Sequence, residues 1–356
     1  KGIGSFKNLN QISVINENKE TIINTKKTII STGSESVSLP GINFDEEKII
    51  SSTGALSISS LPKKMIVVGG GYIGLELGSV YHGFGTEVTV AEYFSELLPM
   101  ADKDMVLPLH NSLSEKFSNI YLSTEVTDLN PHDNKITATF KTKDKIYKNS
   151  FDNILISTGR IPNTASLNLD KAGIKIDKKG FIPVNSRLRT VIPNIFAIGD
   201  VVGNPMLAHK ATHEGKCAAE NISGFDSVFQ PISIPSVIYT NPEIAWVGLT
   251  ETELKNKKIK YNKSVFPWAA SGRAMTMDSI EGKTKILTSE NNSQILGVGI
   301  VGTNAGELIS EAVLAMEMGA TVEDISLTVH PHPTLSETFA NAAEILNKTI
   351  TDLYIK

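Results

Sequence analysis

The pattern of apolar and polar positions is clearest between residues 65 and 92. An uninterrupted apolar run at 65–68 predicts a short buried strand. Helical periodicity follows at 72–82, and a second apolar run at 87–91 predicts another strand, which ends at Glu92. This succession of strand, helix and strand predicts an α/β unit, around which the rest of the chain is organised.

The turn between the first strand and the helix carries three glycines at G-x-G-x-x-G spacing. Gly69 permits a tight turn, Gly71 lets a pyrophosphate approach the helix N-terminus, and Gly74 allows the helix to pack closely on the strand. The carboxylate of Glu92 can accept hydrogen bonds from an adenosine ribose and would repel a 2′-phosphate. Together these features predict an NAD site, and an ordinary strand–turn–helix is the alternative.

Elsewhere the alternation predicts short strands separated by polar turns. Asp102 has the side chain of a helix N-cap, and a helical pattern runs from it to about residue 117. We expect a serine-rich connection at 43–64 and a loop at 93–101. Strands are expected at 11–16, 21–24, 27–31, 119–129, 135–141, 145–148, 153–157 and 194–198.

Two of these strands end in nearly the same sequence. Residues 29–33 read IISTG and residues 155–159 read LISTG. The second copy has a glycine loop upstream of it, whereas the first copy has none. If both belong to related nucleotide-binding domains, the first domain lacks its opening; a chance likeness is the alternative.

The strand at 194–198 ends in Gly199-Asp200, and a helical pattern follows at 205–221. An acid at the end of a buried strand can hold a ribityl or ribose hydroxyl, and the next helix N-terminus can face a phosphate. An ordinary aspartate turn is the alternative. From residue 232 the pattern predicts an α+β domain, with strands at 236–239, 244–247, 264–267, 282–288 and 294–301 and helices at 305–318 and 336–346.

A histidine-rich loop precedes the last predicted helix. His330, His332 and Glu337 combine a proton acceptor for neutral pH with a carboxylate that can orient it. Pro331 and Pro333 stiffen this loop. We favour an acid–base pair over a metal site, because no third ligand stands out. Ordinary helix-start chemistry is the remaining alternative.

Glu76, Arg160 and Cys217 are weaker candidates. Glu76 and Arg160 either face a cofactor or are surface charges. Cys217 lies beside two alanines in a predicted helix and is expected to be a packed residue; as the one cysteine, it excludes an intrachain disulfide. The hydrophobic content of 40% and the net charge of −4 are ordinary for a soluble protein and give no reason to expect nucleic acid or a membrane as partner.

Eight segments, in one order along essentially the whole chain, resemble the dihydrolipoamide dehydrogenases of the pyridine nucleotide-disulfide oxidoreductase family. These enzymes are the flavin-dependent component of 2-oxoacid dehydrogenase complexes. The acid at Glu92 and the histidine-rich ending favour them over their NADPH-using glutathione-reductase relatives. The segments are STGSE (31–35), SSTGALS (51–57), GGGYIGLELGSV (69–80), STGRIPN (157–163), FAIGDV (196–201), PMLAHKA (205–211), YTNPEIAWVG (239–248) and HPHPTLSE (330–337).

The resemblance implies an α/β fold with two Rossmann-like nucleotide-binding domains and a C-terminal α+β dimer-interface domain. The FAD domain, incomplete at its N-terminus, would comprise residues 1–63 and 187–232. The NAD domain would comprise 64–186, and the interface domain 233–356.

The resemblance also implies a function: oxidation of dihydrolipoamide through a cysteine pair and FAD to NAD⁺, in a homodimer that serves lipoyl domains. His332 and Glu337 would be the acid–base pair of the partner subunit's site. The compartment would be the mitochondrial matrix in a eukaryote and the cytoplasm in a bacterium. Positions that match cofactor contacts are, for FAD, Gly33, Asp200, Met206, Leu207, Ala208 and His209, and for NAD, Gly69, Gly71, Gly74, Glu76, Glu92 and Gly159.

The sequence departs from the family in its first part. Neither the family's FAD-binding G-x-G-x-x-G nor its redox C-x-x-x-x-C occurs, and Cys217 matches neither redox cysteine. We therefore expect the parent protein to be a dihydrolipoyl dehydrogenase and this chain alone to be inactive or impaired. The alternatives are a non-catalytic nucleotide-binding or dimerisation module, and an NADH-dependent flavoprotein reductase of another substrate.

The inactivity of the isolated chain can be tested with an absorbance spectrum, an intact mass and a lipoamide assay. A mass that corresponds to 356 residues is expected to come with no flavin band and no lipoamide-dependent NADH formation. Turnover by a protein of that mass would contradict the expectation.

Overall fold

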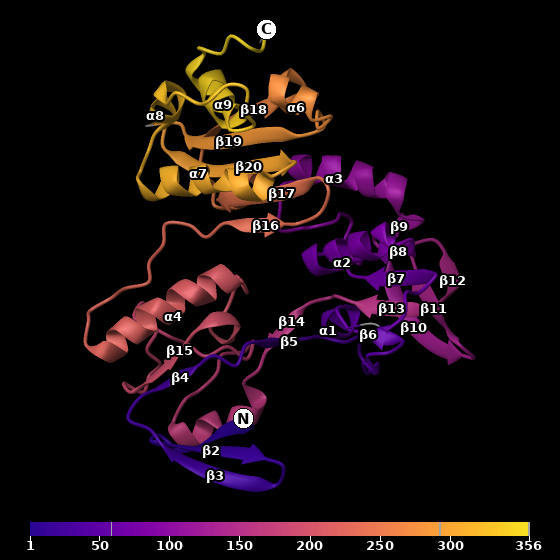
Figure 1. Ribbon diagram of the computed structural model, residues 1–356, viewed down its shortest axis with the longest axis vertical. Coiled ribbons are helices and arrows are strands. Elements are labelled where there is room, and N and C mark those ends of the chain that lie inside the picture. Colours follow the sequence, from indigo (N-terminus) through magenta and orange to yellow (C-terminus); the bar gives the residue numbers. More distant parts are fainter. Residues whose placement is uncertain (58, 292, 355–356) are drawn as a thin grey trace. The chain divides into compact units, whose positions relative to one another are not determined.

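The computed structural model describes residues 1–57, 59–291 and 293–354, and the chain divides into two compact units. Unit 1 comprises Lys1–Val37 and Gly159–Pro231, and unit 2 comprises Ser38–Thr158 and Ile232–Lys356. Figure 1 shows the elements of both units in chain order.

These boundaries differ from the expected domain boundaries at 63/64 and 186/187. Residues 38–63 lie in unit 2, because β6 (Ile49–Ile50) pairs in parallel with β13 (Asn153–Ile156). Residues 159–186 lie in unit 1, where β14 (Arg160–Pro162) pairs with β5 (Ser34–Ser36). In both cases strand pairing with a distant segment, which a local pattern does not reveal, decides where the segment belongs.

Unit 1 contains three small sheets. The strands expected at 11–16 and 21–24 form a hairpin, and a further strand precedes them. Together β1 (Ile3–Asn8), β2 (Gln11–Asn16) and β3 (Lys19–Asn24) form an antiparallel meander. The second sheet pairs β4 (Thr28–Ile30) in parallel with β15 (Ile195–Ala197), and the third is the β5–β14 pair. Helix α4 (Ala208–Ser223) begins three residues later than the pattern at 205–221 predicted.

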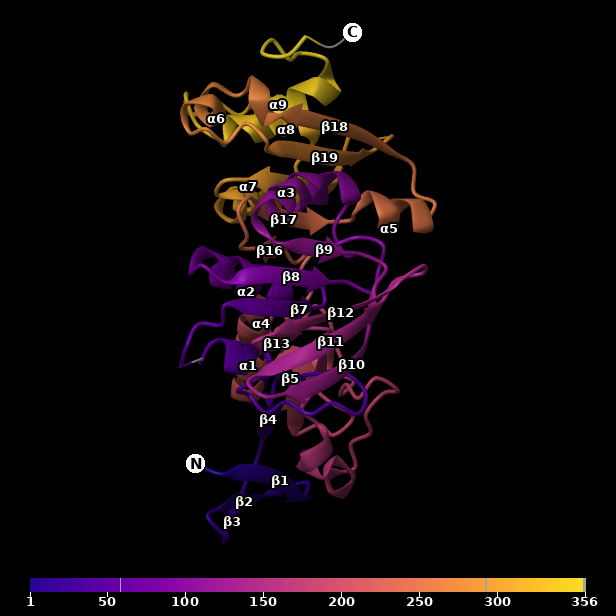
Figure 2. The same cartoon turned by 90° about the vertical axis from the view of Figure 1, so that its right-hand side faces the viewer.

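The first sheet of unit 2 is five-stranded and parallel, in the order β6-β13-β7-β8-β9 (Figure 2). Its central strand β7 is almost entirely buried, as an uninterrupted apolar run requires. The remaining elements of this part are β7 (Lys64–Val68), β8 (Glu87–Ala91), β9 (Asn119–Tyr121), α1 (Ser52–Ala55), α2 (Tyr72–Gly83) and α3 (Lys103–Lys116).

Two expectations for this region were wrong. The serine-rich connection at 43–64 contains the strand β6 and the helix α1. The single strand expected at 119–129 is interrupted near Ser123, whose φ of 50° lies in the left-handed region and breaks the extended conformation. The second half instead begins a separate antiparallel sheet of β10 (Glu125–His132), β11 (Lys135–Lys141) and β12 (Ile146–Phe151).

The C-terminal sheet of unit 2 is antiparallel, as expected, in the order β16-β17-β20-β19-β18. Trp268 is fully buried in its core and donates from Nε1 to Thr284 Oγ1 at 3.0 Å, so it serves packing. The strands are β16 (Ser236–Ile238), β17 (Glu243–Gly248), β18 (Tyr261–Pro267), β19 (Lys283–Ser289) and β20 (Ile295–Gly302).

Helices α7 (Ala305–Glu317) and α9 (Glu337–Asn347) pack on this sheet close to where they were expected. The short helices α5 (Glu251–Asn256), α6 (Gly272–Thr276) and α8 (Val322–Leu327) were not anticipated. Across the described residues, no helix combines the length and apolarity that a bilayer crossing requires.

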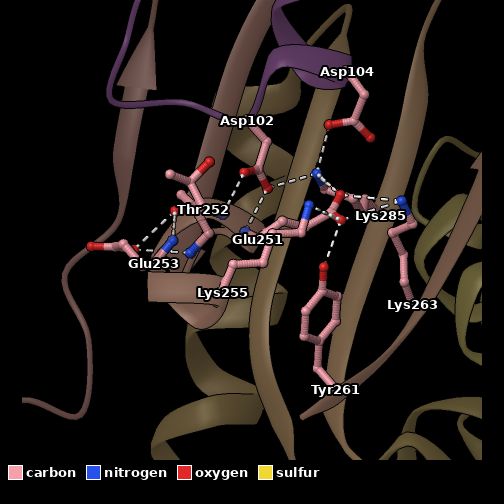
Figure 3. Close-up of polar contacts among 10 residues, drawn as sticks. Asp102, Asp104, Glu251, Thr252, Glu253, Lys255, Tyr261, Lys263 and Lys285 are labelled. Atoms are coloured by element: carbon pink, nitrogen blue, oxygen red, sulfur yellow. Dashed lines mark hydrogen bonds and ion pairs between the residues drawn. The ribbon is translucent and has the colours of Figure 1, made fainter. Parts of the chain in front are cut away.

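A buried ammonium group joins β19 of the C-terminal sheet to α3 and α5 (Figure 3). Lys285 of β19, whose side chain is 1% exposed, donates to Asp102 at 2.6 Å, to Asp104 at 2.7 Å and to Glu251 at 3.1 Å. Asp102 occupies the predicted N-cap position of α3, but its side chain makes no cap hydrogen bond. It accepts from Lys285 and from the backbone N–H of Glu251 instead.

The environment shifts the pKa values of Lys285 and Glu251 in the directions that favour charge. Burial by itself would lower the pKa of Lys285, but hydrogen bonds to Asp102 and Asp104 outweigh it and raise the pKa. Burial would raise the pKa of Glu251, yet hydrogen bonds from Tyr261 and Lys285 bring it down to about 2. Lys285 compensates one of the three negative charges of this cluster, and Lys263 and Lys255 lie 3.3 and 3.7 Å from Glu251.

We expect Lys285→Met to lower the free energy of unfolding by about 3–5 kcal/mol, because it leaves buried carboxylates unpaired. The matched control is Lys263→Met. Its half-exposed ammonium bonds the same Glu251 at 3.3 Å, and we expect it to cost less than about 1 kcal/mol. Urea unfolding at neutral pH measures both changes, and equal losses would contradict the assignment.

Acidification provides a second measurement on the same variants. The pKa of Glu251 is lowered in the folded chain, so its ionisation stabilises the fold above its ordinary pKa of 4.5. That contribution disappears as the pH falls toward 2. Wild type is therefore expected to lose more unfolding free energy over this interval than Lys285→Met.

Candidate active site

The three glycines of the loop between β7 and α2 have different surroundings. Gly69 has a φ of +107°, and a Cβ there would lie 2.6 Å from the carbonyl oxygen of Ser157. A Cβ on Gly74 would lie 2.3 Å from the oxygen of Gly69 and 2.5 Å from Ser157 Oγ. A Cβ on Gly71 would meet nothing within 4 Å. The turn and the close helix packing are thus present, and the open face at Gly71 is where a phosphate group has room.

Electrostatics at this open face favour an anion. Gly71 is the N-cap of α2 and offers no side chain to its N–H groups, and the first turn of the helix holds no acid. The positive end of the helix dipole therefore faces the loop, and no carboxylate in the first turn of α2 offsets its charge. These features fit the pyrophosphate of a dinucleotide.

Glu92 lies at the end of β8, as predicted, and is turned toward the loop. Its Oε2 accepts from the N–H of Gly70 at 2.5 Å, and its Oε1 accepts from the N–H of Phe94 at 2.6 Å. The residue is buried. Each carboxylate oxygen can accept more than one hydrogen bond, so these contacts position Glu92 and leave acceptor capacity for a ribose hydroxyl.

Glu76 is partly buried and has a hydrogen-bond partner within the protein. This half-buried residue of α2 accepts from the backbone N–H of Tyr239 at 2.8 Å. Burial raises the pKa of its carboxyl, and the hydrogen bond from Tyr239 acts in the opposite direction. The side chain thus links the helix after the glycine loop to the C-terminal part of unit 2.

In unit 1, Asp200 belongs to a chain of hydrogen bonds that also contains Arg160. The hydroxyl of Ser34 donates to Asp200 Oδ2 at 2.5 Å, and Arg160 donates from Nε to Ser34 Oγ at 2.7 Å. Gly33 and Gly159, with φ values of +70° and +151°, flank this chain in sequence, and a Cβ on either would meet nothing within 4 Å. Gly159 therefore lies in the same unit as Gly33, whereas the glycine loop and Glu92 lie in unit 2.

The turn that carries Asp200 is fixed to α4 by a buried ion pair. Lys210 contacts Glu214 at 2.8 Å, and Glu214 also accepts from the N–H of Gly199 at 2.6 Å. Lys210 donates to the carbonyl of Gly203 at 3.3 Å. The sequence analysis missed this pair, although a lysine and a glutamate four residues apart on a predicted helix were a usable signal.

The four predicted positions before and within the first turn of α4 lie at the surface of unit 1. Two of them are half-buried and two are exposed, and the N-cap residue makes no side-chain cap. The helix N-terminus is thus accessible to a ligand oxygen. In chain order these positions are Met206, Leu207, Ala208 and His209.

The structure brings His332 and Glu337 together in unit 2. Nδ1 of His332 lies 2.8 Å from Oε1 of Glu337, and the other carboxylate oxygen accepts from the N–H of Thr334 at 2.7 Å. The imidazole is 79% exposed. When Nδ1–H donates to Glu337, the lone pair of Nε2 is left to exchange a proton with a ligand.

His330 and Cys217 do not join this pair. His330 contacts Glu311 of α7 at 2.6 Å, a partner that no sequence spacing indicated. Cys217 is buried in unit 1 beside Ala218, as the sequence predicted, and burial together with Glu220 raises the pKa of its thiol. Cys217 is therefore a packing residue with little thiolate character.

Comparison with known proteins gives a consistent result over nearly the whole chain. Residues 4–215 match the family described as pyridine nucleotide-disulphide oxidoreductase, and residues 234–343 match the dimerisation domain of that family. A dihydrolipoyl dehydrogenase of Vibrio cholerae is 45% identical over 353 residues, which is 99% of this chain and 74% of the relative. A mitochondrial dihydrolipoyl dehydrogenase of Dictyostelium discoideum is 46% identical over 351 residues, or 96% of this chain and 71% of the relative.

Solved structures with the same arrangement include two bacterial proteins. The HOCl-induced flavoprotein disulfide reductase RclA from Escherichia coli superposes with a TM-score of 0.86 at 26% identity, covering 97% of this chain and 78% of that one. LpdA from Mycobacterium tuberculosis superposes with a TM-score of 0.88 at 25% identity, covering 97% of this chain and 76% of that one.

The glycine loop permits a matched pair of alanine substitutions. We expect Gly74→Ala to lower the free energy of unfolding by about 1–3 kcal/mol, because its Cβ would overlap the oxygen of Gly69. We expect Gly71→Ala to change it by less than about 0.5 kcal/mol, since its φ of −79° suits alanine and the space is open. Denaturant unfolding of both variants measures the difference. Similar losses would contradict the distinction between a packing glycine and an open one.

Proposed function

This chain belongs to the pyridine nucleotide-disulphide oxidoreductase family, and on that premise we propose that the protein acts as a dihydrolipoyl dehydrogenase. The reaction converts dihydrolipoamide and NAD⁺ into lipoamide, NADH and a proton. The relatives from Vibrio cholerae and Dictyostelium discoideum that carry this name match 99% and 96% of the chain. The observation that carries the proposal is the contact between His332 and Glu337.

Oxidation of a dithiol requires a base, because the thiolate and not the thiol is the reacting species. His332 offers Nε2 as that base, and Glu337 holds Nδ1–H and stabilises the imidazolium that forms. The exposed position of His332 allows a substrate to reach it. The dyad would take up one thiol proton, and the disulfide that accepts the electron pair would have to come from the family's C-x-x-x-x-C, which does not occur in this sequence.

The residues of unit 2 fit NAD. The open face at Gly71 and the α2 N-terminus would hold its pyrophosphate, and Glu92 would accept from its adenosine ribose. Glu76 would stand one turn further along the same helix. Selection against a 2′-phosphate follows from the negative charge of Glu92.

The residues of unit 1 fit part of a flavin site. Asp200, held by Ser34, would accept from a ribityl hydroxyl, and the N-terminus of α4 would face a flavin oxygen. Gly33 leaves the space beside this chain of hydrogen bonds free of side chains, and Gly159 remains a proposed NAD contact. FAD, when bound, supplies the electron relay between dithiol and nicotinamide.

We infer a homodimer from the match of residues 234–343 to the dimerisation domain. Large apolar side chains are exposed on and after α7, and they would be covered by a second copy. His332 lies in the segment that follows them, so its base would serve a site to which the partner contributes. The exposed side chains are Leu314, Met318, Leu327 and Val329.

The proposal extends to the partners and the compartment that the activity implies. Dihydrolipoamide would reach the dyad on the lipoyl domains of 2-oxoacid dehydrogenase complexes. The compartment would be the mitochondrial matrix in a eukaryote, as for the Dictyostelium relative, and the cytoplasm in a bacterium.

The decisive experiment measures dihydrolipoamide-dependent NAD⁺ reduction by the FAD-loaded parent protein, because this chain alone is expected to be inactive or impaired. His332→Gln is expected to lower kcat by about 10²- to 10⁴-fold, because the proton acceptor is removed. Glu337→Gln is expected to lower it as well, because its amide would donate to Nδ1 and leave the ring proton on Nε2. His132→Gln, which changes an exposed histidine on β10, is the matched control and should retain activity.

Electron transfer from NADH to ferricyanide provides the second measurement, since this reaction needs no dithiol base. Both dyad variants should retain it. Unchanged dihydrolipoamide turnover in the His332 variant would contradict the role of the dyad. NADH oxidation with another disulfide but not with lipoamide would favour a different flavoprotein reductase. Dinucleotide binding without any turnover would favour a non-catalytic module.

A further inference from the structure

A second histidine–glutamate pair lies two residues before the dyad and is built differently. His330 is only 7% exposed, whereas His332 is 79% exposed. Nδ1 of His330 lies 2.9 Å from the carbonyl oxygen of Thr328, and Nε2 lies 2.6 Å from Glu311 Oε1. Both ring nitrogens therefore face oxygen atoms, and a carbonyl oxygen accepts hydrogen bonds without donating any.

This arrangement determines what His330 can do. Nδ1 must carry a hydrogen to satisfy the carbonyl of Thr328. A neutral ring would then direct the lone pair of Nε2 at the carboxylate of Glu311, which is repulsive, while a doubly protonated ring donates to both oxygens. With two N–H donors engaged, His330 has no lone pair with which to act as a base. The two neighbouring histidines are thus separated into a fixed donor and a free acceptor.

The pair of His330 and Glu311 also connects three parts of the C-terminal fold. Glu311 lies on α7, Thr328 follows α8, and His330 starts the loop that leads into α9. Two further acids influence the surroundings. On α9 the pKa of Glu344 is raised by burial and by Asp352, and the charge of His330 opposes this shift.

The loop between the two pairs has little freedom. Pro331 and Pro333 restrict its backbone on both sides of His332. The hydroxyl of Thr334 donates to the carbonyl of Pro331 at 2.7 Å, and the N–H of Thr334 donates to Glu337. One end of the loop is thus tied to Glu337 and the other end to His330. The direction of His332 depends on both ties.

We propose that His330 is a positioning residue, an imidazolium that binds Glu311 and the carbonyl of Thr328 and thereby fixes the loop that aims His332. The inference rests on the proposed function only for its kinetic consequence. The hydrogen-bonding state of His330 and the orientation of His332 are properties of the fold and can be measured without turnover.

The kinetic test compares three variants of the FAD-loaded protein in dihydrolipoamide-dependent NAD⁺ reduction. His330→Leu removes both hydrogen bonds and is expected to lower kcat by about 10- to 100-fold, because a displaced base reacts poorly, with the KM for NAD⁺ unchanged. Glu311→Ala should behave in the same way. Glu311→Gln should restore most of kcat, because its amide can donate to Nε2 of a neutral ring that still donates to Thr328. Glu323→Ala, an exposed acid on α8, is the matched control.

Nitrogen-15 NMR of the histidine rings gives the readout that does not depend on activity. The sequence has seven histidines, so His330→Leu and His332→Gln assign the two signals directly. At neutral pH the wild-type His330 ring is expected to carry hydrogen on both nitrogens, and the Glu311→Gln ring on Nδ1 alone. The His332 signals should shift in His330→Leu and stay near wild type in Glu311→Gln.

The outcomes separate this inference from the proposed function. A neutral His330 ring in wild type, or unchanged kcat and unchanged His332 signals in a folded His330→Leu variant, would overturn the positioning role. An FAD-loaded wild-type parent protein that does not oxidise dihydrolipoamide would overturn the proposed function, and the NMR comparison would still decide the role of His330.

Discussion

The burial of one ammonium group constrains much of unit 2. Lys285 is surrounded by carboxylates from α3 and α5, and removing any of these elements from β19 would leave charges without partners in a poorly solvated place. These contacts attach α3, which follows strand β8 in the chain, to strand β19 of the C-terminal sheet. Apolar packing contributes as well, since Met105 of α3 lies against Gly299 of β20. The charged contacts fix the position of α3 on the C-terminal sheet, because apolar contacts alone would allow the helix to shift along the sheet.

A second regularity concerns carboxylates that use both oxygens to hold a loop. Glu92 accepts from the N–H of Gly70 in the glycine loop and from the N–H of Phe94, which follows β8. Glu337 likewise accepts from Thr334 while it orients His332. In each case the acid lies at the end of a regular element and fixes the irregular backbone beside it. Loops that carry binding or catalytic groups are thus anchored to a helix or a strand, which limits their motion.

Local pattern was sufficient for the parts of the fold whose periodicity is strong. The strand before the glycine loop, the helix after it and the five C-terminal strands lie within about three residues of their expected positions, within the usual uncertainty of element ends. Features that depend on distant partners were not predictable. Strand β6 has two residues and pairs with β13, about a hundred positions away in sequence. A strand of two residues is too short for the periodicity of the sequence to predict it. The unit boundaries follow from the same kind of pairing.

In the candidate site, too, the features that are local in sequence were predicted and those that depend on distant partners were not. Spacing alone identified the glycine loop, Glu92 and the His332–Glu337 pair, because each is local in sequence. Glu311 and Lys285 were missed, because their partners are remote. The buried Cys217 adds a consequence for a protein that handles dithiols. Its raised pKa and its packing keep the thiol out of exchange with a disulfide substrate, so the chain contributes no competing sulfur that could trap the substrate as an off-pathway mixed disulfide.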